Sequence, residues 1–133
     1  EKIEEFLPQV GKISIAYISA QKNQGIENLL KLSERLDKIC DRRLTTSELN
    51  EFLIQILNRH PHPNKNGRPV KIKYITQLKV RPSHFIIFSN YPNYIKDSYK
   101  RYLINEIRKE FDFHGVPIRM DFRGSDNPYD SKK

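Results

Sequence analysis

The chain has 133 residues, of which 37% are hydrophobic, and a formal net charge of +8 at pH 7. This length predicts about one domain, and without an apolar run of 18 residues we expect no membrane span. The single cysteine, Cys40, excludes an internal disulfide and favours the reducing cytoplasm. Because the chain lacks both an initiator Met and a signal peptide, we interpret it as a fragment of a cytoplasmic protein.

The excess positive charge is confined to one region. Residues 59–101 contain ten basic residues and one acid, a formal charge of +9, whereas bases and acids balance over residues 1–40. Such an asymmetry favours a polyanionic partner for this region, and RNA is the commonest one. The alternative is a solvated, lysine-rich surface.

Residues 1–40 predict the end of an α/β unit. A helix end at residues 3–7 stops at Pro8, and residues 12–18 predict a strand that is apolar on both faces, as in a parallel sheet. A loop at residues 19–25 then precedes a helix whose apolar spacing runs from Ile26 to Cys40. One strand and one helix cannot form a domain, so this piece must pack on other segments.

Residues 41–133 predict a self-contained module. A capping box from Thr45 to Glu48 begins a helix that ends before Pro61, and residues 60–67 predict a loop. Residues 70–80 alternate as a half-buried strand with a basic outer face. The alternation assigns to the inner face Val70, Ile72, Tyr74, Leu78 and Val80.

The rest of the module completes a small sheet. Residues 84–90 predict a central strand, residues 96–111 a helix that exposes its bases, Arg108 among them, and residues 116–123 a third strand. In the third strand Arg119, Asp121 and Arg123 are assigned to the outer face. The predicted fold is therefore α/β, an α-β-β-α-β arrangement in which a three-stranded sheet carries helices on one face.

One loop carries a nucleotide-binding signature. Ser19-Ala20-Gln21 follows the expected buried strand and precedes a helix, and it resembles the last guanine-contacting loop of translation-factor-type GTPases. In that family the alanine amide contacts the guanine base. The alternative is an ordinary turn between a strand and a helix.

Many dispersed motifs in one order extend the resemblance to the whole chain. They are residues 44–50 (LTTSELN), 66–74 (NGRPVKIKY), 76–77 (TQ), 81–82 (RP), Phe85, 88–90 (FSN), 98–103 (SYKRYL), 115–119 (GVPIR) and 123–129. Together they resemble the C-terminal part of the Der (EngA) tandem GTPases. Residues 1–40 are similar to the end of the second GTPase domain, and residues 41–133 to the KH-like domain.

The resemblance implies a role in ribosome biogenesis, specifically in late assembly of the large ribosomal subunit. GTP and Mg²⁺ would belong to the parent protein, in which two GTPase domains switch with nucleotide and pack against the KH-like domain. Only Ser19, Ala20 and Gln21 match nucleotide-contacting positions, because the phosphate-cradling, switch and base-reading motifs are missing from this sequence. We therefore expect no GTP hydrolysis by this chain.

The KH label implies RNA binding, but not through the usual clamp. Standard KH domains hold RNA with a Gly-x-x-Gly loop, and no two glycines here have that spacing. Recognition of backbone and shape through basic residues is then expected. The predicted phosphate contacts are Lys71, Lys73, Lys79, Arg81, Lys100 and Arg101. For each of them, a solvated side chain or an intramolecular salt bridge is the alternative.

Other chemistry has less support in the sequence. His60 and His62 flank a proline without a nearby Cys or acid, so we expect no metal site. A second hypothesis makes the module an intramolecular scaffold whose basic face meets an acidic face of the missing GTPase domains. A small nuclease ranks last, because residues 59–101 offer a single acid, Asp97, for metal binding.

Overall fold

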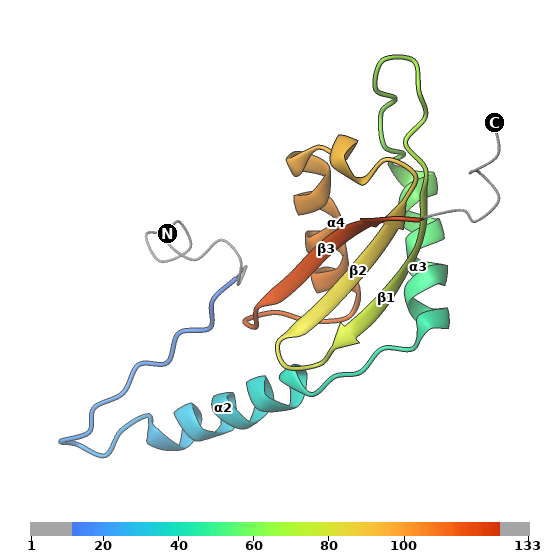
Figure 1. The fold of residues 1–133 in the computed structure, drawn as a ribbon. Coiled ribbons are helices and arrows are strands. Elements are labelled where there is room, and N and C mark those ends of the chain that lie inside the picture. The colour runs from blue at the N-terminus through green and yellow to red at the C-terminus, as the bar shows by residue number, and fades with distance from the viewer. Residues whose placement is uncertain (1–11, 126–133) are drawn as a thin grey trace.

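The computed structural model describes residues 12–125, which include one three-stranded sheet (Figure 1). The expected helix end at residues 3–7 lies outside this range, and so does the part of the last matching motif that follows residue 125. The elements in chain order are α2 (Ile26–Cys40), α3 (Thr46–Arg59), β1 (Ile72–Lys79), β2 (Ser83–Ser89), the 3-10 helix η1 (Pro92–Tyr94), α4 (Asp97–Glu110) and β3 (Ile118–Gly124).

The sheet has the order β1-β2-β3, with β1 and β2 antiparallel and β2 and β3 parallel. Helices α3 and α4 cover one face of the sheet, where α3 packs against β1 and α4 against β3 (Figure 1). The parallel pair is possible because α4 carries the chain back from the end of β2 to the start of β3. The predicted α-β-β-α-β fold is confirmed.

The core lies between the sheet and these two helices. Its fully buried side chains include Phe85 and Ile87 from β2, Leu53 from α3 and Leu103 from α4. Each such side chain stabilises the fold by about 1.5–3 kcal/mol relative to its exposure to water. Within residues 12–125, no helix covers the opposite face of the sheet (Figure 1).

Helix α3 begins at the predicted capping box. The Thr45 hydroxyl accepts a hydrogen bond from the Glu48 N–H at 3.2 Å, and the Glu48 carboxylate accepts from the Thr45 N–H at 2.9 Å. Hydrogen bonds from the Thr45 hydroxyl and N–H lower the pKa of Glu48, since they stabilise its charged form.

The face assignment predicted for β1 is wrong over most of its length. Ile75 is completely buried and Gln77 nearly so, while Tyr74 and Leu78 are 43% and 47% exposed. The reason is that the pairing with β2 shifts register twice, between Ile72 and Tyr74 and between Gln77 and Lys79. Each irregularity adds a residue and inverts the alternation, which a strict period of two cannot reveal.

The strand predicted at residues 12–18 is not formed, and this prediction is corrected. The segment has no regular secondary structure, and Ile15 and Tyr17 are 57% and 88% exposed. A strand apolar on both faces needs neighbouring strands and covering helices, which the described residues do not supply. Gly25 ends the loop that follows, with φ of +78°, and a Cβ there would meet the Tyr17 carbonyl oxygen at 2.3 Å.

Two side-chain amides satisfy backbone groups of β1 and the chain before it. Asn50 of α3 exchanges two 3.0 Å hydrogen bonds with the N–H and C=O of Ile75. Asn90 accepts from the Lys71 N–H at 2.8 Å and donates to the Pro69 carbonyl at 3.0 Å. β1 is an edge strand, so the Asn50 amide occupies groups of Ile75 that would otherwise be open to another strand. The Asn90 amide instead extends the contact between the chain before β1 and the end of β2.

A third amide joins α2 to the module. The Gln77 side chain accepts from the Leu44 N–H at 2.8 Å and donates to the Arg42 carbonyl at 3.1 Å. Ile39, near the end of α2, is 3% exposed and belongs to the core. The C-terminal end of α2 is therefore anchored on the module, although most of the helix extends away from the sheet (Figure 1).

Arg108 of α4 was predicted to be exposed, and this is wrong. Its side chain is buried, and its guanidinium donates to the carbonyls of Phe113 and Val116 at 2.8 and 2.7 Å. These bonds hold the connection from α4 to β3 in place. Burial lowers the pKa of Arg108, because it disfavours the charged form.

Candidate nucleic-acid interface

The uncovered face of the sheet is defined by its register. Residues paired directly across strands point to the same side, and this gives three rows on the face opposite α3 and α4. The rows, each written from β1 through β2 to β3, are Tyr74–Phe88–Arg123, Thr76–Ile86–Asp121 and Lys79–His84–Arg119. We call these nine residues the open face.

An aromatic pair occupies one end of the open face. The rings of Tyr74 and Phe88 are stacked, with centroids 4.4 Å apart and planes 16° from parallel. Tyr74 is 43% exposed, so part of its ring is available to a ligand. Arg123 is exposed in the same row. Arg123 is paired with Phe88 and lies two strands from Tyr74, so a nucleic-acid base could stack on the exposed ring while Arg123 neutralises a phosphate further along the backbone.

The only acid of the open face is neutralised within it. The Asp121 carboxylate lies 2.8 Å from Nε2 of His84 and 3.5 Å from the Arg119 guanidinium. Although partial burial opposes ionisation, the His84 hydrogen bond and the Arg119 charge lower the pKa of Asp121. Three cations, Lys79, Arg119 and Arg123, therefore outweigh one carboxylate that is already paired.

The three predicted lysines of the strand region stay together. Lys79 lies on the open face, opposite His84, because the second register shift turns it there. Lys73 is the extra residue of the first shift and Lys71 precedes the strand; both are exposed. All three thus line the β1 side of the sheet.

The two predicted residues of α4 lie apart from these lysines. Lys100 and Arg101 belong to the helix that packs against β3, at the other edge of the sheet. The Lys100 ammonium lies 3.0 Å from the Asp97 carboxylate and 5.6 Å from the centre of the Phe122 ring. The six predicted residues do not form one continuous surface.

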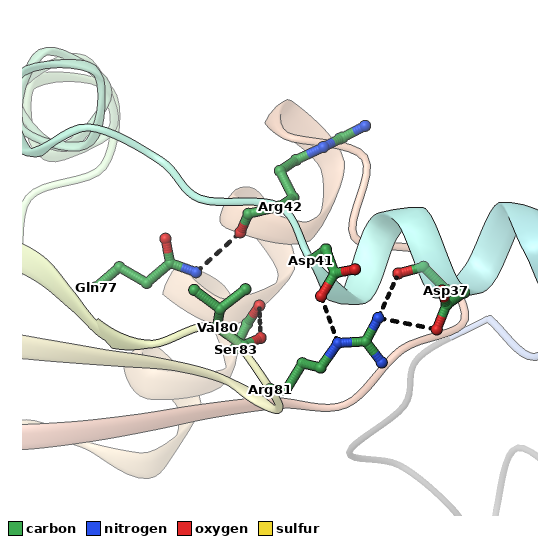
Figure 2. A network of polar contacts seen from close by, with 7 residues as sticks. All are labelled: Asp37, Asp41, Arg42, Gln77, Val80, Arg81 and Ser83. Atoms are coloured by element: carbon green, nitrogen blue, oxygen red, sulfur yellow. Dashed lines mark hydrogen bonds and ion pairs between the residues drawn. The ribbon is translucent and has the colours of Figure 1, made fainter.

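Arg81 is the predicted residue with the most developed intramolecular contacts. Its guanidinium binds the carboxylates of both Asp37 and Asp41, the first at 2.8 Å (Figure 2). These hydrogen bonds, first with Asp41 and then with Asp37, raise the pKa of Arg81, and the bond from Arg81 lowers the pKa of Asp41. Arg81 thus forms the intramolecular ion pair that the sequence left as its alternative.

Arg119 and Arg123 are not among the predicted contacts, although the sequence pattern places both on the outer face of the third strand. Their alternation with Ile118, Met120 and Phe122 was a sufficient signal, because it is not interrupted by a bulge. The aromatic pair had no such signal, since Tyr74 had been assigned to the inner face.

The predicted nucleotide-contacting loop is an exposed tight turn. Ser19 and Gln24 exchange backbone hydrogen bonds of 2.9 and 3.0 Å, and Ala20 and Gln21 are exposed at its tip. Within residues 12–125 no group of three or more His, Cys, Asp or Glu side chains could hold a metal ion. His62 instead lies 2.7 Å from the Pro63 carbonyl oxygen through Nδ1. No described helix is long and apolar enough to cross a membrane.

Comparison with known proteins agrees with this architecture. Residues 43–123 match the family described as the KH-domain-like, C-terminal domain of EngA bacterial GTPase enzymes. Proteins named GTPase Der are 45% identical over 132 residues in Agrobacterium fabrum and 44% over 129 residues in Rickettsia prowazekii. These alignments cover 99% and 96% of this chain, but only 28% and 29% of those proteins.

The family match covers the whole sheet together with α3 and α4, and the similarity to the two relatives continues through α2. The order of elements is the one predicted from the sequence pattern. The chain therefore belongs to the family of KH-domain-like C-terminal domains of EngA bacterial GTPases.

Proposed function

We propose that this chain is the C-terminal part of a cytoplasmic GTP-binding protein of ribosome biogenesis, and that its module docks on rRNA of the large subunit through the open face. The observation that carries this proposal is the stacked Tyr74–Phe88 pair in a row with Arg123, on a sheet face that no helix of the described residues covers. The predicted residues Lys71 and Lys73 extend the positive charge along the β1 side of the face.

The chemistry of this face suits single-stranded or looped RNA. Lys79, Arg119 and Arg123 would neutralise phosphates, while an unpaired base would stack on the exposed part of the Tyr74 ring. Base stacking on an aromatic side chain contributes about 1–3 kcal/mol per base and depends little on sequence. The face therefore favours recognition of backbone and shape, as expected for a domain without the Gly-x-x-Gly clamp.

Catalysis is not part of the proposed role of this chain. GTP and Mg²⁺ would bind to other parts of the parent protein, because the sequence lacks the phosphate-cradling and switch motifs. The exposed turn at Ser19, Ala20 and Gln21 would supply at most one edge of a guanine site. The expected result is no GTP turnover by the purified chain above a buffer control, and measurable turnover would contradict this expectation.

The docking face is tested by fluorescence anisotropy with a labelled RNA hairpin at several salt concentrations. The variant Lys79→Gln/Arg119→Gln/Arg123→Gln removes three cations from the open face; the control Lys12→Gln/Lys22→Gln/Lys109→Gln removes three exposed cations elsewhere. If three phosphate contacts are lost, the log–log salt slope of binding becomes shallower by roughly 2–2.7. Equal slopes for variant and control would refute docking through this face.

A second candidate function is an intramolecular scaffold for the GTPase domains, without RNA binding. The Arg81 ion pairs with Asp37 and Asp41 favour it, because they show a basic residue of the module binding acids of α2. This alternative predicts no RNA affinity at moderate salt and a salt-sensitive complex when the GTPase domains are added in trans. Ultracentrifugation of the mixture would distinguish the two functions.

A further inference from the structure

The bases of α2 gather on one side of the helix, although the charges of the helix balance in the sequence. With 100° between successive residues, four bases fall within an arc of roughly 60° on this helix and its first residues beyond. They are Lys31, Arg35, Lys38 and Arg42. The acids Asp37 and Asp41 lie on an adjoining arc and bind Arg81 (Figure 2). The four bases therefore face a different part of the molecule from Arg81.

The four bases line one cavity. It has a volume of about 420 Å³ and lies between α2 and the turn after α4, where Asp112 contributes the opposite wall. Glu34 and Ile39 complete the lining. With four cations and two carboxylates, the walls carry a formal charge of +2. We call this cavity the α2 groove.

Each base at the two ends of the α2 groove contacts a neighbouring group. The Arg42 guanidinium donates to the Phe111 carbonyl and lies 5.9 Å from the Phe113 ring centre, and Figure 2 shows its side chain pointing away from Arg81. Lys31 binds Glu27 at 2.6 Å in a solvent-exposed pair. Such pairs contribute little and exchange easily for another anion.

The two central bases have no ion pair within the described residues. Arg35 and Lys38 are exposed, and no carboxylate of residues 12–125 lies within 4.0 Å of either charged group. Two like charges three residues apart on a helix repel each other by a few tenths of a kcal/mol unless an anion binds between them. An anionic ligand would relieve this repulsion.

We propose that the α2 groove binds the phosphate backbone of RNA, as a second contact separate from the open face. The stripe from Lys31 to Arg42 is about 16 Å long, which is long enough to contact more than one phosphate. Arginine donors in a planar fork suit phosphate oxygens. The binding would depend on backbone charge and not on base identity.

An acidic protein segment is the less suitable occupant. Protein partners obtain most of their affinity from buried aromatic or aliphatic anchors in a pocket. The groove offers one aliphatic side chain, Ile39, which is 3% exposed and already part of the core. A ligand bound by charge alone fits these walls better.

The inference rests on the proposed role in RNA docking, and the experiment separates the two. The chain is titrated with a fluorescein-labelled RNA hairpin by anisotropy, with three variants compared. Arg35→Glu/Lys38→Glu reverses the central charges of the groove, whereas Lys22→Glu/Lys109→Glu reverses two exposed charges elsewhere. Arg35→Lys/Lys38→Arg exchanges the residue types and keeps the charge. All the positions are exposed, and circular dichroism verifies the fold of each variant.

The expected result is a loss of affinity of at least tenfold for the groove variant, with a salt slope shallower by about 1.4–1.8, as two lost phosphate contacts predict. The control should bind within twofold of the parent chain, and the charge-conserving variant should retain binding. Equal losses in groove variant and control would overturn the inference, because net charge alone would then explain both. Unchanged binding of the groove variant would overturn it and leave the open face unaffected.

Three further outcomes test the class of partner and the two proposed contacts. If polyglutamate of matched charge competes as well as unlabelled RNA, the groove does not select RNA and the inference fails. If the open-face variant Lys79→Gln/Arg119→Gln/Arg123→Gln loses no affinity while the groove variant does, the groove stands and the proposed docking face fails. If the parent chain does not bind the hairpin, both fail.

Discussion

The amide of Gln77 offers the sharpest test of how α2 is anchored on the module. The Gln77 side chain is buried, and Gln77 is 4% exposed. Its amide binds two backbone groups of the link between α2 and α3 (residues 41–45), the Leu44 N–H and the Arg42 carbonyl. Gln77→Leu keeps a similar volume but removes both partners. A buried backbone group without a partner costs about 1–3 kcal/mol, so two together, less some gain from apolar burial, should lower the free energy of unfolding by about 2–4 kcal/mol.

The measurement is urea unfolding followed by circular dichroism at pH 7. Gln55→Leu on the exposed side of α3 is the matched control, since the same substitution there removes no buried contact; it should change stability by about 0.5 kcal/mol or less. If Gln77→Leu also changes stability by less than about 0.5 kcal/mol, the two hydrogen bonds do not anchor the link and the reasoning is refuted.

Two further predictions concern the sheet. Asn50→Leu removes both hydrogen bonds to Ile75, which should lower the free energy of unfolding by about 1–3 kcal/mol; an unchanged urea midpoint would contradict the role given to this amide. Because the folded pKa of Asp121 is lowered, its ion pairs stabilise the fold above the unfolded pKa of about 3.9, and this contribution is lost as the pH falls through the folded value. Asp121→Asn should therefore weaken the decline of melting temperature as the pH falls below about 4, and parallel curves for the two proteins would be evidence against it.

Predictions that depend on local signals agree with the structure. The capping box at Thr45 and Glu48 fixes the start of α3 because both partners lie within one helical turn. The alternation of β3 correctly places Arg119 and Arg123 outward, since that strand pairs without a bulge. In the first case the two partners are close in sequence, and in the second the residues alternate without interruption.

Predictions that depend on distant partners fail for physical reasons. The two register shifts of β1 arise from its pairing with β2, and they invert the faces of Tyr74 and Ile75. Arg108 is buried because the carbonyls of Phe113 and Val116 accept its hydrogen bonds, and nothing in the helical pattern reveals these acceptors. The strand expected at residues 12–18 needs a sheet that the described residues do not contain.

The candidate site could be predicted only in part, because it too depends on contacts between residues distant in the sequence. In the sequence, residues 59–101 carry the excess positive charge and residues 1–40 are neutral. In the fold, the charged residues at the end of α2 face two different places, Arg81 and the α2 groove. Asp37 and Asp41 bind Arg81 of the module, whereas the four bases line the α2 groove together with Glu34. The spacing of those bases, at intervals of four, three and four residues, was visible in the sequence and is the signal that would have found them.

This division of charge has a consequence for the two proposed contacts. The Arg81 ion pairs and the Gln77 hydrogen bonds hold the end of α2 on the module, so the α2 groove and the open face belong to one framework. Surface ion pairs weaken with salt, whereas the buried amide contacts do so much less. If both contacts take one RNA, neutralising Arg81 with Arg81→Met should reduce affinity less than the groove variant, because Gln77 still anchors the link. An equal loss would mean that Arg81 itself binds the RNA, as the sequence first suggested.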